Sequence, residues 1–340
     1  MAKRLVEITI PRHHASDLTE VLEQLAPEAF IQLHSPESSL VIQRAVLEAE
    51  AVEAVIDPLQ SRFAGTEHFQ ILILPVLAAL PREAEPEPQE RETEAAPKSH
   101  RVSREELYNE LAPAAKVTPV YLTMTVLSTV VATIGLSRDS GAIVIGAMVI
   151  APLLGPNMVL ALATTTGDRP LATRALKANG IGVATAIVMT LLIGPFVTVD
   201  PALPEMHSRT QVAMGDVFLA LAAGTAGAVA FTSGVAASLI GVMVAVALLP
   251  PLVVTVLLFS KGHTADGAGA LLLLATNVIC VNLAAVATFA IQGVVPRRWW
   301  EKQQTRRDTI KAIIFWVVLL AIAATLIVIG IRDDELLPTP

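Results

Sequence analysis

One apolar stretch, residues 145–162 (IGAMVIAPLLGPNMVLAL), restricts the possible folds of this chain more than any other feature. It is apolar enough to enter a bilayer, yet Pro152, Gly155 and Pro156 lie near its middle. A proline inside a helix removes one backbone hydrogen bond and clashes with the preceding turn. Because hydrocarbon supplies no water to replace that bond, such a break persists only inside protein or beside a wet cavity. The stretch therefore predicts a broken helix in a membrane-spanning bundle.

A second stretch, residues 240–257 (IGVMVAVALLPPLVVTVL), repeats this pattern 95 positions later, with nine of eighteen residues identical. Three pairs of helix-breaking or polar residues match between the copies: Gly155 and Pro250, Pro156 and Pro251, and Asn179 and Asn277. The spacing makes each repeated unit about three spans long. An odd number of spans inserts the second copy upside down, so the sequence predicts an inverted repeat with broken helices, which recurs in transporters.

The composition supports an integral membrane protein. Hydrophobic residues make up 53% of the 340 residues and charged residues only 16%, and the mean hydropathy is +0.61. The net charge of −7 argues against nucleic acid as a partner. The single cysteine, Cys280, lies in an apolar run, which excludes an internal disulfide and favours a small core residue. Lys3 and Arg4 are followed by a mixed segment, so we expect no cleavable signal peptide.

Residues 1–78 predict a soluble domain with a ferredoxin-like α+β fold. The alternation and the helical spacing of apolar residues give the order strand, helix, strand, strand, helix, strand. The expected strands are 5–10, 30–33, 40–47 and 69–74. The first expected helix begins at about Asp17, which forms a capping box with Glu20, and the second covers 51–63. Adjacent His13 and His14 would diverge on a regular element, so we expect surface histidines and no metal site.

The soluble domain is followed by a linker, residues 79–100, which is rich in Glu and Pro and cannot bury enough apolar surface to fold. Residues 101–116 predict an amphipathic helix with a capping box of Ser103 and Glu106, lying on the membrane surface or on the bundle.

Seven spans are expected from length, because about 20 apolar residues cross the hydrocarbon. They are 119–136, 141–163, 178–199, 217–231, 236–259, 268–292 and 312–331. The first three form membrane repeat 1 (117–199), the next three form repeat 2 (216–293), and the last stands alone. Nine Lys and Arg residues in loops on the side of the N-terminus, against four on the other side, predict a cytoplasmic N-terminus and an outer C-terminus.

The residues expected to line a substrate or ion pathway are the helix breakers and the asparagines inside the spans. They are Pro152, Gly155, Pro156, Asn157, Asn179, Pro250, Pro251, Asn277 and Asn282. Backbone groups freed at a break give ligands without a charged side chain. Three plainer interpretations remain open. The prolines only kink helices, the asparagines only bond helix to helix, and Gly146, Gly155 and the small residues 220–227 only allow close helix packing.

No Asp, Glu, Lys or Arg lies deep inside an expected span, which disfavours a proton-driven pump. No nucleophile–base pair, phosphate loop or metal-ligand motif is recognisable, so we expect neither an enzyme nor a cofactor.

The segment SGAIVIGAMVIAPLLGPNMVLALATTTGD, residues 140–168, is similar to a prokaryotic family of hydrophobic membrane proteins known only as a domain of unknown function, family 389. The resemblance is concentrated in the core G-A-M-x-x-A-P-L-x-G-P and extends over about residues 115–295. It implies several spans, but it brings no known activity or site residues.

Two functions fit these features. The first is a transporter or channel for a small solute or ion, which the cytoplasmic domain regulates or holds in a homo-oligomer. The second is a membrane scaffold or sensor that transports nothing and whose soluble domain binds a ligand or partner.

Overall fold

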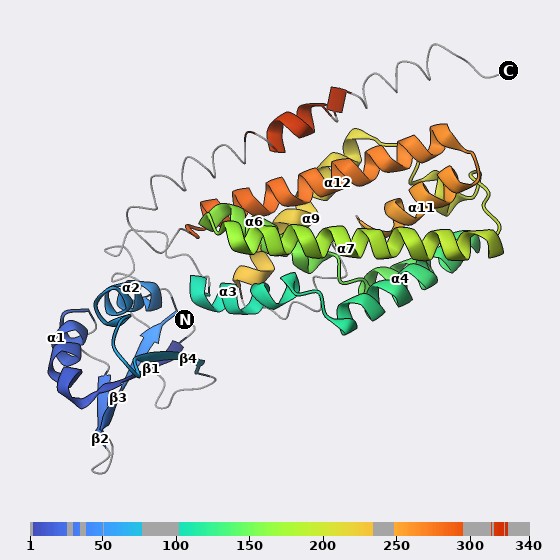
Figure 1. Cartoon of the computed structure of the whole chain (residues 1–340). Coiled ribbons are helices and arrows are strands. Elements are labelled where there is room, and N and C mark those ends of the chain that lie inside the picture. The colour runs from blue at the N-terminus through green and yellow to red at the C-terminus, as the bar shows by residue number, and fades with distance from the viewer. Residues whose placement is uncertain are drawn as a thin grey trace. The chain divides into compact units, whose positions relative to one another are not determined.

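The structure is a computed structural model. It describes residues 3–25, 30–34, 39–49, 51–76, 102–233, 248–294, 314, 316–322 and 324–325. The chain divides into two compact units, residues 1–107 and 108–340 (Figure 1).

The first unit is built on a four-stranded antiparallel sheet. Its strands are β1 (Lys3–Pro11), β2 (Phe30–His34), β3 (Leu40–Glu48) and β4 (Gln70–Pro75), in the spatial order β2-β3-β1-β4. The short η1 (Arg12–His14) leads into α1 (Ala15–Leu25), and α2 (Val52–Phe63) precedes β4. The predicted order of strands and helices is confirmed, and it is the split βαβ arrangement.

One face of this sheet and the two helices share a core. Alternate residues of β1 (Val6, Ile8 and Ile10) are fully buried, as period-2 side chains require. They pack with apolar residues of α1 and α2, such as Leu22 and Leu59. The predicted helix start at Asp17 is wrong, because α1 already begins at Ala15, directly after η1.

The helix α3 (Arg104–Leu111) begins in the first unit and ends in the second. Its predicted capping box is confirmed: the Ser103 N–H donates to Glu106 Oε2 (3.0 Å), and the Glu106 N–H donates to Ser103 Oγ (3.3 Å). Leu107 and Leu111 are buried, as expected for one face of an amphipathic helix.

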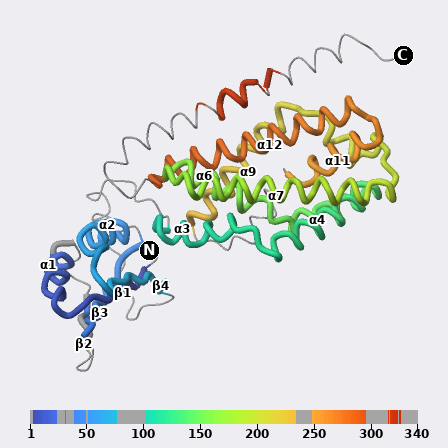
Figure 2. Tube along the Cα trace, in the orientation of Figure 1, coloured from blue at the N-terminus to red at the C-terminus, as the bar shows by residue number. Residues whose placement is uncertain are grey.

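The described part of the second unit contains helices and no strand. Its helices after η2 (Ala112–Ala115) are α4 (Pro119–Ser137), α5 (Gly141–Ile150), α6 (Leu154–Thr166), α7 (Arg169–Ile193), η3 (Gly194–Phe196), α8 (Pro204–His207), α9 (Met214–Thr232), α11 (Leu249–Ser260) and α12 (Thr264–Ile291). Figure 2 traces this path, and Figure 1 shows α4 and α7 running one way along the unit and α9 and α12 the other.

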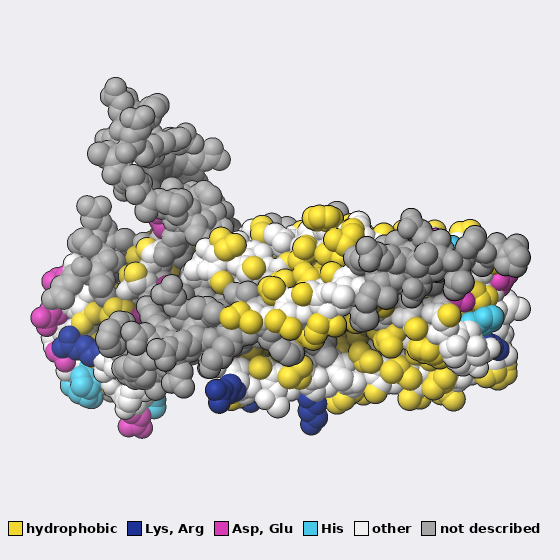
Figure 3. All heavy atoms as spheres, turned by 90° about the horizontal axis from the view of Figure 1, so that it is seen from above, with side chains coloured by type: hydrophobic (Ala, Val, Ile, Leu, Met, Phe, Trp, Pro, Cys, Tyr) yellow, Lys and Arg dark blue, Asp and Glu magenta, His cyan; other side chains and the backbone are white. Residues whose placement is uncertain are grey.

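Four helices, α4, α7, α9 and α12, are long and apolar enough to cross a membrane, and the bent pair α5–α6 is a fifth candidate span. Hydrophobic side chains are spread along the visible face of this unit (Figure 3). These features indicate a membrane protein. The other two expected spans lie partly outside the described residues: 236–259 up to position 247, and 312–331 over half of its length.

The third expected span begins earlier than predicted. α7 starts at Arg169, because Asp168 Oδ1 accepts the Leu171 N–H at 2.9 Å and Pro170 suits the first turn. The cations expected in a loop, such as Arg174 and Lys177, therefore lie on the first turns of this helix.

Candidate functional site

The predicted helix break is present between α5 and α6. The two helix axes differ in direction by 51° across a break of at most four residues, and Ala151 has extended backbone (φ −65°, ψ 122°). Pro152 and Pro156 have no N–H, so the carbonyls of Met148 and Pro152 lose the donors that a continuous helix would give them. The break thus leaves backbone acceptors inside the bundle.

Three of the predicted asparagines meet at this break, from three different helices. Asn157 of α6 is the hub: its Nδ2 donates to Asn179 Oδ1 of α7 (3.3 Å), and its Oδ1 accepts from Asn282 Nδ2 of α12 (3.1 Å). Asn157 Nδ2 also donates to the Leu153 carbonyl at the start of its own helix (2.9 Å). Asn157 and Asn282 are buried and Asn179 is half-buried. We call these three residues the asparagine cluster.

One oxygen of the asparagine cluster is unpaired. Asn282 Nδ2 donates to Asn157 and to the Val278 carbonyl (2.9 Å), but Asn282 Oδ1 is buried and accepts no hydrogen bond from any described residue. An unpaired buried acceptor costs about 1–3 kcal/mol. The cluster can therefore accept a donor or a cation without first breaking one of its own bonds.

Close packing holds the broken helix in place. A Cβ on Gly155 would lie 2.7 Å from the Ala114 Cβ of η2, so only glycine allows η2 to approach here. On the other side, a Cβ on Gly182 of α7 would lie 3.0 Å from Leu153 Cδ2. The sequence analysis left open that Gly155 allows close helix packing, and this contact agrees with that interpretation, but it did not identify η2 as the partner.

Tyr121 of α4 is a polar residue near the break that the sequence analysis missed. Its hydroxyl is buried and donates to the Ala178 carbonyl of α7 (3.0 Å), one residue before Asn179. The only sequence signal for Tyr121 was its position at the end of an apolar span. Tyrosine is common there because its ring suits the membrane–water interface, so the position did not point to a site.

The second predicted break is described only from Leu248 onward. Pro250 and Pro251 are buried in the first turn of α11, where proline is tolerated because a backbone N–H in that turn would have no partner in the helix. Asn277 is also buried on α12, but it is not among the partners of the asparagine cluster. The structure therefore brings together Pro152, Gly155, Pro156, Asn157, Asn179 and Asn282 at one place.

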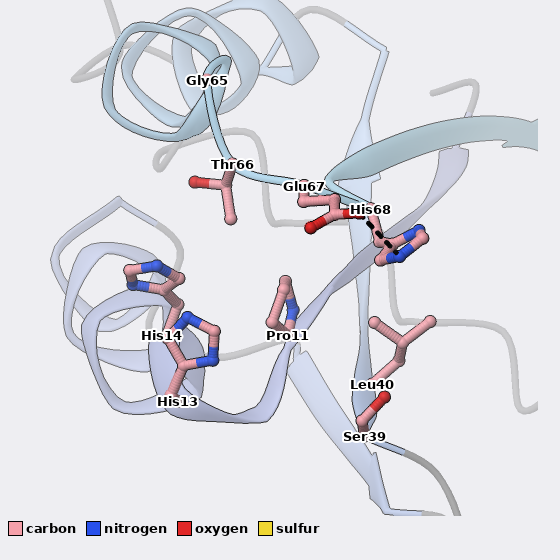
Figure 4. Close-up of a pocket in the computed structure, with 9 residues that line it drawn as sticks. All are labelled: Pro11, His13, His14, Ser39, Leu40, Gly65, Thr66, Glu67 and His68. Carbon is pink, nitrogen blue, oxygen red and sulfur yellow. Dashed lines mark ion pairs between the residues drawn. The ribbon is translucent and has the colours of Figure 1, made fainter.

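The first unit contains a separate polar cavity of about 480 Å³ (Figure 4). His13 and His14 face it from η1, while Thr66, Glu67 and His68 border it from the turn between α2 and β4 (Figure 4). The rings of His13 and His14 are adjacent, with centroids 4.3 Å apart. No group of three or more possible metal ligands occurs among the described residues.

The family model for a domain of unknown function, DUF389, matches residues 148–283, from the end of α5 to the last third of α12. An uncharacterized protein, MJ0678, of the archaeon Methanocaldococcus jannaschii is 32% identical over 329 residues, covering 96% of this chain and 99% of the relative. This chain belongs to the DUF389 family. No solved structure matches it.

The DUF389 match includes all three members of the asparagine cluster and the break beside them. The similarity to the archaeal relative extends over nearly the whole of both chains, so it includes the soluble unit as well as the helical one. Neither match assigns an activity.

Proposed function

We propose that this DUF389 protein is a transporter or channel, and not an enzyme, for a small solute or ion. It spans the plasma membrane seven times, with the N-terminus in the cytoplasm and the C-terminus outside. The excess of Lys and Arg in the loops on the N-terminal side supports this orientation.

The observation that carries the proposal is the asparagine cluster at the broken helix. Three uncharged amides from α6, α7 and α12 meet where two prolines free backbone carbonyls, and Asn282 Oδ1 has no donor among the described residues. Transporters place substrates and coupling ions at discontinuous helices near the midplane. Amide and carbonyl oxygens fit a small neutral solute or a monovalent cation better than they fit an anion.

The packing of the helical unit supports the inverted repeat on which this proposal is based. α6 contacts α7 of its own repeat and α12 of the other repeat. In the same way, α11 contacts α12 of its own repeat and α7 of the other repeat. The opposite directions of α4 and α7 against α9 and α12 also fit two copies inserted upside down to each other.

Regulation by the soluble domain is supported by polar contacts at the start of α3. The Arg104 N–H donates to Glu53 of α2 (2.6 Å), and the Arg104 guanidinium donates to Asp57 (2.8 Å) and to Glu105. Burial lowers the pKa of Arg104, but hydrogen bonds and charge from Glu105 and Asp57 outweigh that effect and raise it. The contacts with Glu53 and Asp57 join the first turn of α3 to α2.

A sensor without transport is the second candidate, and the histidine-lined cavity of the soluble domain favours it. In that function the asparagine cluster would only hold three helices together.

Water access to the break separates the two functions. Single cysteines replace residues 150–160 in a Cys280→Ala background, and a membrane-impermeant thiol reagent is applied to each side of sealed vesicles. The transporter predicts labelling at positions 152–157 but not at lipid-facing Val149, which serves as the control. Uniform protection of a folded chain would remove the support for a pathway.

Flux through reconstituted vesicles then tests the role of the cluster. Light scattering after an osmotic step with sodium chloride, potassium chloride or urea reports entry of each solute. Asn157→Ala should abolish any entry that the wild-type chain supports, while Thr225→Ala, whose hydroxyl bonds only within α9, should leave it unchanged.

A further inference from the structure

The sheet of the soluble domain has a second face, opposite the one that α1 and α2 cover. Strand pairing places Leu5, Glu7 and Thr9 of β1 on this face, opposite the buried Val6, Ile8 and Ile10. The neighbouring strands add four exposed apolar side chains: Ile31 (67% exposed), Val46 (39%), Leu72 (40%) and Leu74 (45%). We call these residues, together with Arg44 and Ile42, the open face.

The register arranges the open face in rows across the strands. The central row, read from β4 to β2, is Leu72, Glu7, Arg44 and Ile31. Glu7 Oε2 and Arg44 Nε are paired at 2.7 Å in the middle of this row. The next row is entirely apolar, with Leu74, Leu5 and Val46 side by side.

Residues 76–80 (VLAAL), directly after β4, are apolar, but the charged part of the segment that follows the domain is poorly suited to cover this surface. Residues 81–100 contain no Leu, Ile, Val, Met, Phe, Tyr or Trp. They hold six Glu against three Lys and Arg, so they favour water over contact with Leu72 or Leu74.

The central row has the symmetry that a self-association requires. Read in reverse it runs Ile31, Arg44, Glu7, Leu72, so an apolar residue again lies at each end and opposite charges lie in the middle. Consider a twofold axis that runs parallel to the strands, between β1 and β3, in the plane between two facing sheets. Rotation about this axis places the central row of the second copy opposite the central row of the first, in reverse order. That operation sets each Glu7 against Arg44 of the second copy, and each Leu72 against Ile31.

We propose that the open face binds the open face of a second copy of this chain, with the two sheets packed face to face. This proposal specifies the oligomerising role suggested for the soluble domain, and it does not depend on whether the helical unit transports anything. The face is small compared with a standard interface of about 800 Å² per partner. Two copies in one membrane meet at a high effective concentration, which allows so small a contact to persist.

Cross-linking of the full chain in its membrane tests the register. Two chains with different tags, one with Ile31→Cys and one with Leu72→Cys, both in a Cys280→Ala background, are produced together and treated with a short bifunctional thiol reagent. The proposal predicts mixed dimers, and few dimers from either variant alone, because identical positions lie three strands apart. Glu23→Cys, on the helix-covered side of the domain, serves as the control.

Charge exchange tests the complementarity. Glu7→Arg or Arg44→Glu alone should reduce recovery of one tagged full chain with another by about tenfold or more, because like charges then face each other. Produced together, the two variants should associate again, because the arginine introduced in one chain then faces the glutamate introduced in the other.

Two results would overturn the proposal: mixed cross-links no more frequent than those of the Glu23→Cys control, or charge variants that do not restore each other. Hydrogen exchange of β1 shows that each variant is folded, so neither result can be assigned to misfolding. Solute flux is measured in vesicles made from the same samples. If the mixed cross-links form but no solute enters, the result counts against the transport proposal and not against the association of the open faces.

Discussion

The interior of the soluble unit and the buried side of helix α4 in the helical unit differ in polarity. In the soluble unit, most of the fully buried residues are apolar, such as Ile8 and Leu59, although Gln43 is buried as well. In α4 of the helical unit, the buried residues include Thr125, Ser128 and Thr129, while Leu127 is 49% exposed. Lipid removes the advantage of burying leucine, so helices associate through small residues and hydrogen bonds. Stability in the two units should therefore respond to different substitutions.

The largest expected effect is a core truncation in the soluble unit. Ile8→Ala should destabilise that unit by about 2–5 kcal/mol, because Ile8 is fully buried and its loss leaves a cavity. Hydrogen exchange should accelerate in β1, β3 and β4. The matched change in the helical unit, Leu127→Ala, removes a large residue that faces lipid and should have almost no effect. Equal effects at both positions would contradict the comparison.

The next effect concerns close packing in the helical unit. Gly155→Ala places a methyl group 2.7 Å from the Ala114 Cβ, and overpacking of this kind costs about 1–3 kcal/mol. Gly146→Ala in the same bent span is the control, because a Cβ there meets nothing within 4 Å. Ala114→Gly should partly restore the stability of the Gly155→Ala chain, as measured by thermal unfolding in detergent. If Ala114→Gly restored no stability, the contact between η2 and α6 would not be the cause of the destabilisation by Gly155→Ala.

A smaller effect is expected from the hydrogen bonds of the asparagine cluster. Asn157→Leu removes the hub and leaves Asn179 and Asn282 without their partner, at a cost of about 1–2 kcal/mol in a membrane. A double-mutant cycle with Asn282→Ala should show coupling, since Asn282 loses the same bond. Additive changes in unfolding free energy would mean that the two amides do not interact.

The same contrast explains how far the sequence could predict the structure. In the soluble unit, alternating residues such as Val6 and Ile8 predicted the order of strands correctly, because burial follows hydrophobicity there. In the helical unit, hydrophobicity located the described spans and both ends of α4, but it did not locate the start of α7 or the neighbours of each helix. Asp168 and Pro170 fix the true start of α7 by local hydrogen bonding, a signal that a span-length rule ignores.

The candidate site was predictable in part for the same reason. Pro152 and Pro156 predicted the break from their chemistry alone, and Asn157, Asn179 and Asn282 were recognisable as polar residues inside apolar spans. Their convergence was not predictable, because it depends on how α6, α7 and α12 are packed. Asn277, an equally good candidate, is not a partner of the cluster.

The smallest predicted effect concerns ionisation at the end of α3. Burial raises the pKa of Tyr108, the nearby negative charge of Asp168 raises it further, and Arg174 opposes the shift. The chain has two tyrosines, so in a Tyr121→Phe background the phenolate absorbance reports Tyr108 alone. Its midpoint in the folded chain should lie above the ordinary value of about 10, which the denatured chain should show.

The sign of this shift fixes what neighbouring substitutions should do. A tyrosine with a raised folded pKa contributes stability that is fully present below the unfolded pKa and is lost as pH rises through the folded one. Asp168→Asn should lower the midpoint while keeping the cap of α7, because asparagine caps helices as well as aspartate does. Arg174→Gln should raise it. If Asp168→Asn left the midpoint unchanged, burial alone would determine the pKa, and α3 would not interact electrostatically with the start of α7.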